Sequence, residues 1–142
     1  PEMVVTRLAP VVDVEANIVE TMQRCLDGRA ELIVLVGGSG GGHRFSSTLG
    51  KDYTHSAMEL WLDSKTAHEI YGKNGHMWSK LVCGTKGDCL VVNVPGPLRE
   101  AVAAIGAFAA VVRESRDIER INDAMADAVY AQYPQDKVQR DA

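Results

Sequence analysis

Two stretches rich in glycine or proline each follow directly after a largely apolar run. GGSGGG occupies residues 37–42 after the apolar run 32–36, and PGP occupies residues 95–97 after the run 89–94. A backbone without side chains lets several N–H groups converge on an anion such as a phosphate or a carboxylate. A flexible turn explains some glycine but not five in six residues, so we predict a ligand-binding loop at 37–42.

This loop does not match the common nucleotide-binding motifs. The Walker A pattern GxxxxGK[ST] is absent, and the dinucleotide pattern GxGxxG fails because His43 stands where its third glycine would be. The anion-binding interpretation therefore depends on the glycines and on the residues that follow them.

Charged residues follow the glycines and offer two kinds of chemistry. Arg44 and Lys51 can neutralise a phosphate, and Asp52 can hold Mg²⁺ that bridges to phosphate oxygens. Asp52 also precedes a predicted helix, so a helix-capping role is equally compatible with its position. Asp13 has the same two interpretations, with its cap at the start of an earlier helix.

The predicted elements decide whether the two loops can meet. We predict strands at 3–9, 32–36 and 89–94, helices at 13–28, 54–71, 98–114 and 117–132, and a frayed tail at 133–142. Strands that are apolar on both faces are typical of a parallel sheet covered by helices on both sides. Ligands bind beyond the carboxyl ends of such strands, where both loops would lie.

Composition narrows the class of protein. The 142 residues fit one domain, spanning 1–142, and 46% of them are hydrophobic, which is enough for a core. The net charge of −4 argues against a nucleic-acid partner, and no apolar run is long enough to cross a membrane. Three scattered cysteines indicate reduced thiols in the cytoplasm rather than disulfides, and no cluster at ligand spacing indicates a metal site.

In these motifs, the chain resembles the molybdenum-cofactor-binding domain of molybdopterin adenylyltransferases, the MoaB/Mog type. The resemblance spans roughly residues 3–112. Its motifs here are Gly37-Gly38-Ser39-Gly40, then Lys51-Asp52-Tyr53-Thr54, then VVNVPG at 91–96, with Pro10 to Asp13 resembling the family's upstream acidic turn. The family's first strand has no counterpart upstream of Pro1, and residues 41–50 are longer than the family loop.

The resemblance implies an α/β fold of three layers, α/β/α, with a mostly parallel sheet, commonly in a homotrimer. It implies that a molybdopterin or molybdenum cofactor is the ligand, with its phosphate on the glycine loop. The cofactor-binding residues implied are Gly37, Gly38, Ser39, Gly40, Gly41, Lys51, Thr54, Asn93, Pro95 and Gly96. In adenylyltransferases of the family, carboxylates matching Asp13 and Asp52 support catalysis with Mg²⁺ and ATP.

Three functions remain open on the sequence. The chain can bind the pterin cofactor without catalysis, in cofactor biosynthesis or delivery to a molybdoenzyme. It can be an active molybdopterin adenylyltransferase that uses Mg²⁺ and ATP. It can also be a generic nucleotide- or phosphate-binding regulatory domain.

Overall fold

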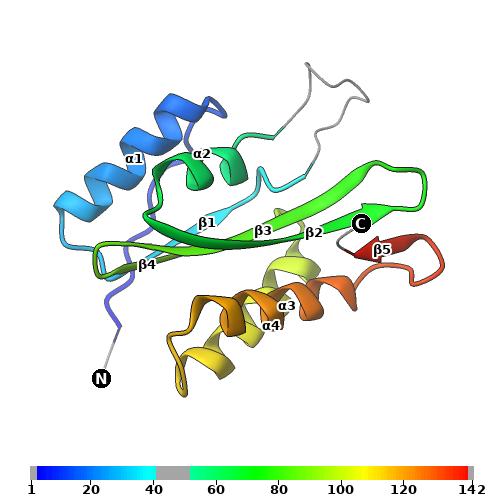
Figure 1. Ribbon diagram of the computed structural model, residues 1–142. Helices are drawn as coiled ribbons and strands as arrows, with labels where there is room; N and C mark the ends of the chain where they lie inside the picture. The colour runs from blue at the N-terminus through cyan, green and yellow to red at the C-terminus, as the bar shows by residue number, and fades with distance from the viewer. Residues whose placement is uncertain (1–2, 41–51, 141–142) are drawn as a thin grey trace.

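The computed structural model describes residues 3–40 and 52–140, which form a five-stranded sheet between two layers of helices (Figure 1). In chain order the elements are α1 (Glu15–Asp27), β1 (Leu32–Val36), α2 (Thr54–Trp61), β2 (Ser64–Gly72), β3 (Met77–Lys86), β4 (Cys89–Val94), α3 (Leu98–Val112), α4 (Ile118–Tyr130) and β5 (Val138–Arg140). The predicted three-layer α/β/α class is confirmed.

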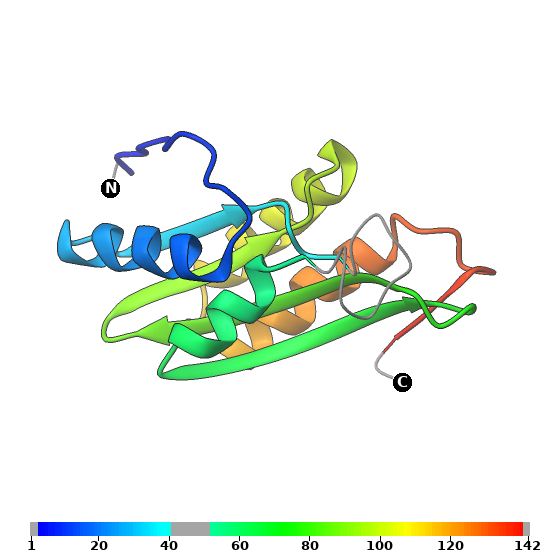
Figure 2. The same ribbon diagram turned by 90° about the horizontal axis from the view of Figure 1, so that it is seen from above.

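Each face of the sheet has its own apolar core. On one face, α1 and α2 bury side chains such as Met22 and Met58, and Figure 2 shows both helices lying over the sheet. On the other face, α3 and α4 bury Phe108 and Met125. Every residue of β4 is buried because this strand contributes side chains to both cores. This explains its continuous apolar sequence.

The sheet is mixed, and the predicted mostly parallel arrangement is wrong. The strand order is β1-β4-β3-β2-β5, and among the described strands only β1 and β4 run parallel. The strands β2, β3 and β4 follow one another through short turns, which forces antiparallel pairing. Between β3 and β4 the turn needs only two residues, and Gly87 supplies the positive φ of 57° that it requires.

The segment 62–71 is a second correction, because we predicted that the helix beginning at 54 would continue through it. Helix α2 ends at Trp61, and Leu62 already has the extended ψ of 143°. The following residues form β2, whose Thr66 and Ile70 pair with Cys83 and Ser79 of β3. Pairing with β3 on one side and with β5 on the other outweighs a local sequence that is compatible with either structure.

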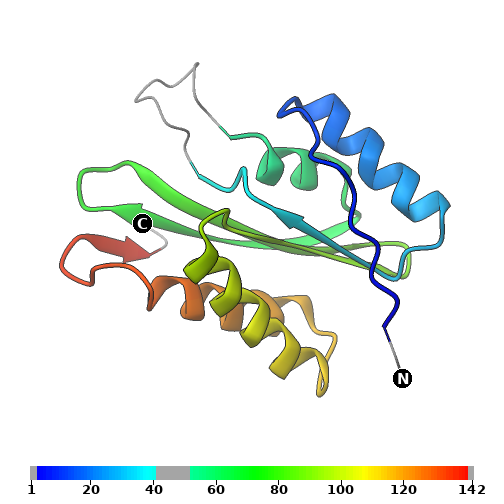
Figure 3. The same cartoon turned by 180° about the vertical axis from the view of Figure 1, so that it is seen from behind.

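Both ends of the chain also differ from the prediction. The predicted strand at 3–9 is absent: Val4 and Val5 are 95% and 83% exposed, and Figure 3 shows this segment running along the β1 side of the molecule. The predicted frayed tail instead contains β5, which pairs with β2 and buries Val138. A strand needs a partner for its backbone, and β5 has one.

The strand β1, whose apolar sequence predicted a strand covered by helices on both faces, lies at the edge of the sheet. Its Val34 and Val36 side chains are 38% and 68% exposed as a result.

Within the described residues, no helix is long and apolar enough to cross a membrane.

Candidate functional site

The two loops predicted to share an edge do so, because β1 and β4 are neighbouring parallel strands. The Gly37 N–H donates to the Val94 carbonyl at 3.0 Å, which ties the loop after β1 to the end of β4. The approach beyond that point is close: a Cβ on Gly96 would lie 3.6 Å from the Gly37 Cα. Both loops therefore border the same space.

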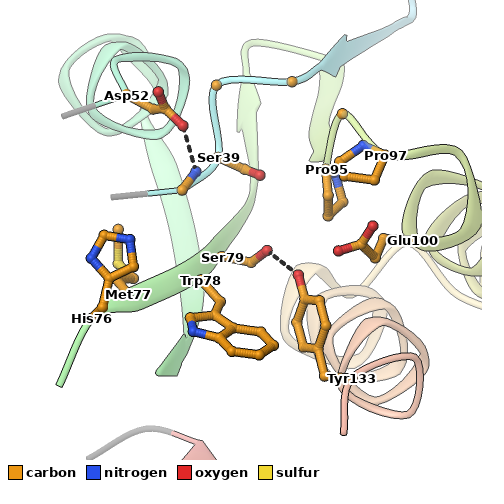
Figure 4. A pocket seen from close by; sticks show the side chains of 14 residues that line it. Ser39, Asp52, His76, Met77, Trp78, Ser79, Pro95, Pro97, Glu100 and Tyr133 are labelled. Atoms are coloured by element: carbon orange, nitrogen blue, oxygen red, sulfur yellow. Dashed lines mark hydrogen bonds between the residues drawn. The ribbon is translucent and has the colours of Figure 1, made fainter. Parts of the chain in front are cut away.

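That space is an open cleft of about 390 Å³, within the range typical of small-molecule sites. Figure 4 shows the glycine loop facing side chains from β3, from α3 and from the segment after α4. The cleft is lined by Gly37, Gly38, Ser39, Gly40, Asp52, His76, Met77, Trp78, Ser79, Pro95, Gly96, Pro97, Glu100 and Tyr133.

The glycine loop has a conformation that a side chain would disturb. Gly37 and Gly38 have φ values of +88° and +64°, in the left-handed region that favours glycine. A Cβ on Gly38 would overlap the Thr54 hydroxyl and lie 3.0 Å from the Thr54 Cβ. Within the described residues, the N–H groups of Gly38 and Ser39 donate no hydrogen bond, so they are available to an acceptor.

The two predicted catalytic carboxylates have different positions. Asp52 lines the cleft, and its Oδ2 accepts a hydrogen bond of 3.0 Å from the Gly40 N–H, so it holds the glycine loop in place. Asp13 is not among the lining residues; its Oδ1 accepts from the Tyr53 N–H at 3.3 Å. Neither aspartate caps a helix as an N-cap residue: Val14 precedes α1 and Tyr53 precedes α2.

Two predicted cofactor-binding residues support the cleft from behind rather than line it. Thr54 donates its N–H to the Gly38 carbonyl at 3.2 Å. Asn93 is fully buried and bridges β4 to β3, accepting from the Val82 N–H at 2.6 Å and donating to the Lys80 carbonyl at 3.0 Å. The predicted ligands Gly41 and Lys51 lie outside the described residues.

Sequence reasoning missed the wall that faces the glycine loop. Trp78 and Tyr133 pack edge to face, with ring centroids 5.0 Å apart and an interplanar angle of 83°. The Tyr133 hydroxyl forms a 2.6 Å hydrogen bond with the buried Ser79 hydroxyl. Tryptophan is rare in this sequence, with two in the chain, so Trp78 could have been singled out as a candidate binding residue. Only the fold brings it beside Tyr133.

Electrostatically, the described part of the cleft is acidic. It contains the carboxylates of Asp52 and Glu100, and none of its described lining residues is a lysine or an arginine. Burial raises the pKa of the Tyr133 hydroxyl far above its ordinary value; the hydrogen bond with Ser79 opposes this shift, and the Glu100 carboxylate adds to it. Tyr133 is therefore a neutral hydroxyl at physiological pH. No group of three His, Cys, Asp or Glu side chains in the described chain is arranged to hold a metal ion.

Comparison with known proteins identifies a fold but not a family. No family model matches the chain, and no curated protein matches it significantly. A solved structure described as "anomalous substructure of MogA" is similar, with a TM-score of 0.50 and 20% sequence identity. The similarity covers 80% of this chain and 71% of that one. At this identity the likeness shows that the chain has a MogA-like α/β fold.

Proposed function

We propose that the chain binds a molybdopterin-type cofactor in the cleft, with the ligand's phosphate on the glycine loop and its ring against the opposite wall. The observation that carries this proposal is the pairing of the two loops on β1 and β4 around one cleft of ligand size. The MogA-like fold adds support for a role related to molybdenum cofactor biosynthesis or delivery.

The charge of the cleft favours a ligand with one phosphate over a nucleoside triphosphate. Two carboxylates line it, and the positive end of the described site consists of backbone N–H groups at Gly38 and Ser39. Backbone N–H groups that point to one place can bind a phosphate group. A triphosphate would bring several more negative charges close to Asp52 and Glu100 and would need cations to offset them.

The direct test is a search for bound pterin. The protein would be purified from a host that makes molybdopterin, denatured and oxidised, and the released material assayed for fluorescent pterin. We expect a nearly stoichiometric signal from the parent chain and a strongly reduced signal from Gly38→Val, whose side chain would overlap Thr54 and displace the glycine loop. No pterin on well-folded parent protein would overturn the proposal in favour of a generic phosphate-binding domain.

Adenylate transfer with Mg²⁺ and ATP is the second candidate, favoured by the position of Asp52 at the cleft. The variant Asp52→Asn separates the two functions, because Asn keeps an oxygen that can accept from the Gly40 N–H but loses the charge that binds Mg²⁺. If the protein is an enzyme, the variant should lose adenylate transfer and still bind pterin. Equal transfer activity in variant and parent would exclude a catalytic Asp52.

We also propose that the chain forms a homo-oligomer, a trimer by resemblance to the family. Three apolar side chains of α3 lie on one exposed stripe: Leu98, Val102 and Ile105 are 77%, 62% and 38% exposed. Their spacing places them on one face of the helix. An apolar stripe of this kind is typical of a protein interface, and a second copy of the chain would cover it.

A further inference from the structure

The wall opposite the glycine loop has its own chemistry. Its residues come from three separate places: Trp78 and Ser79 from β3, Glu100 from the first turn of α3, and Tyr133 from the segment after α4. We call these four residues the aromatic wall. None of them belongs to the motifs that suggested a phosphate site.

The two rings of the aromatic wall are held in place. The edge-to-face contact fixes Trp78 against Tyr133, and the hydrogen bond to Ser79 fixes the phenol in turn. Ser79 cannot move easily because it is only 1% exposed. The indole is also packed against β2, since a Cβ on Gly72 would lie 2.7 Å from its Nε1. Rigid aromatic side chains of this kind bind a flat heterocycle with little loss of entropy.

Glu100 adds polarity to this apolar surface. Figure 4 shows its carboxylate between Pro95 and the Tyr133 hydroxyl, directed into the cleft. In the described chain it forms no ion pair with a lysine or an arginine. A carboxylate accepts about four hydrogen bonds, and Tyr133 can supply only one. Most of its accepting capacity therefore faces the ligand space.

A carboxylate in this position selects ligands by the donors on their edge. The pyrimidine ring of a 2-amino-4-oxopteridine presents two neighbouring donors, the N3–H and the 2-amino group, which match the two oxygens of a carboxylate. The 2,4-dioxopteridine has an oxygen in place of the amino group, and that oxygen would be repelled.

We propose that Glu100 determines the specificity of the cleft, accepting hydrogen bonds from the N3–H and the 2-amino group of a 2-amino-4-oxopteridine that packs on Trp78 and Tyr133. This inference rests on the proposed function, because it assumes that the phosphate of the same ligand binds the glycine loop. It adds the side chain that recognises the pteridine ring, Glu100 in the first turn of α3.

The test uses two ligands and two proteins. The ligands are a 6-(phosphoalkyl)-2-amino-4-oxopteridine and the 2,4-dioxo compound that is otherwise identical, and calorimetry measures their affinities for the full chain and for Glu100→Gln. The parent should bind the amino compound at least about 10-fold more tightly. Glu100→Gln should weaken binding of the amino compound by about 10- to 100-fold and reverse the preference, because its amide can donate to the 2-oxo group.

The outcomes separate this inference from the proposed function. Tight binding of both ligands to the parent, unchanged in Glu100→Gln, would overturn the role of Glu100 and leave the proposed function intact. Binding of neither ligand to folded parent protein would overturn both. Circular dichroism and thermal melting check that the variant is folded, and Glu100→Asp is a second variant that keeps the charge on a shorter side chain. It should retain the preference for the amino compound at reduced affinity; a reversed preference would contradict the proposal.

Discussion

The sharpest prediction compares two neighbouring glycines that differ in their surroundings. Gly37 and Gly38 both have positive φ, but a Cβ on Gly37 would meet no atom within 4 Å. On Gly38 the same Cβ would overlap the Thr54 hydroxyl. The variants Gly37→Ala and Gly38→Ala therefore share the backbone cost and differ in one contact.

The magnitudes follow from these contacts. An alanine in the left-handed region costs about 1–2 kcal/mol, which both variants should show as a loss of unfolding free energy. Gly38→Ala must also push Thr54 away, although that residue is only 8% exposed and its N–H is bonded to the Gly38 carbonyl. Losing that hydrogen bond and straining the start of α2 should add about 1–3 kcal/mol.

Urea unfolding of both variants and the parent measures the difference. A double variant, Gly38→Ala with Thr54→Ala, removes the overlapping hydroxyl and should recover about 1 kcal/mol relative to the sum of the single changes. We also expect Gly38→Ala to weaken pterin binding about 10-fold or more, because the shifted loop no longer presents its N–H groups together. Equal destabilisation by Gly37→Ala and Gly38→Ala, with no coupling to Thr54, would refute the reasoning.

Three further predictions concern other parts of the molecule. Asn93→Ala should cost about 2–4 kcal/mol of unfolding free energy in urea titrations, because it leaves buried backbone groups of β3 unpaired. The control variant Asn93→Asp can still accept a hydrogen bond from β3 and should cost less. A cost below about 0.5 kcal/mol for the alanine variant would contradict the bridging role of Asn93. Burial raises the pKa of the Cys83 thiol from 9.0 to about 12. The stabilisation that comes from keeping this thiol protonated in the folded state is therefore fully present below pH 9. As the pH rises toward 12, the free energy of unfolding should fall by about 1.4 kcal/mol per pH unit. Alkaline unfolding should show this slope in the parent and a smaller one in Cys83→Ala, and identical slopes would exclude it. Val102→Asp should dissociate the proposed homo-oligomer into monomers, as measured by light scattering. The control variant Arg113→Asp changes an exposed residue at the end of the same helix and should leave the oligomer intact. A parent chain that is monomeric would contradict the proposed homo-oligomer.

Local sequence determined much of the site. The glycine and proline loops are encoded directly, because glycine is the residue that tolerates the φ values of Gly37 and Gly38. The apolar runs of β1 and β4 predicted a parallel pair, and their pairing brought both loops to one edge. The helices α1, α3 and α4 also lie where their apolar periodicity predicted them.

One feature of the sheet was readable from the sequence but was missed. The dipeptide Gly87-Asp88 stands between two strand-forming segments and is typical of a two-residue hairpin turn. Recognising it would have predicted antiparallel pairing of β3 with β4. The mixed sheet would then have replaced the mostly parallel one.

Tertiary structure alone decided the rest. The segment 64–72 became a strand because β3 and β5 offer partners on both sides, and residues 3–9 did not become a strand because no described segment pairs with them. The aromatic wall also depends on a long-range contact, since Ser79 and Tyr133 are 54 residues apart and meet only when the segment after α4 packs on β3. Loop conformation is a local property of glycine, whereas the partner of a strand and the opposite side of a cleft depend on which distant segments pack together.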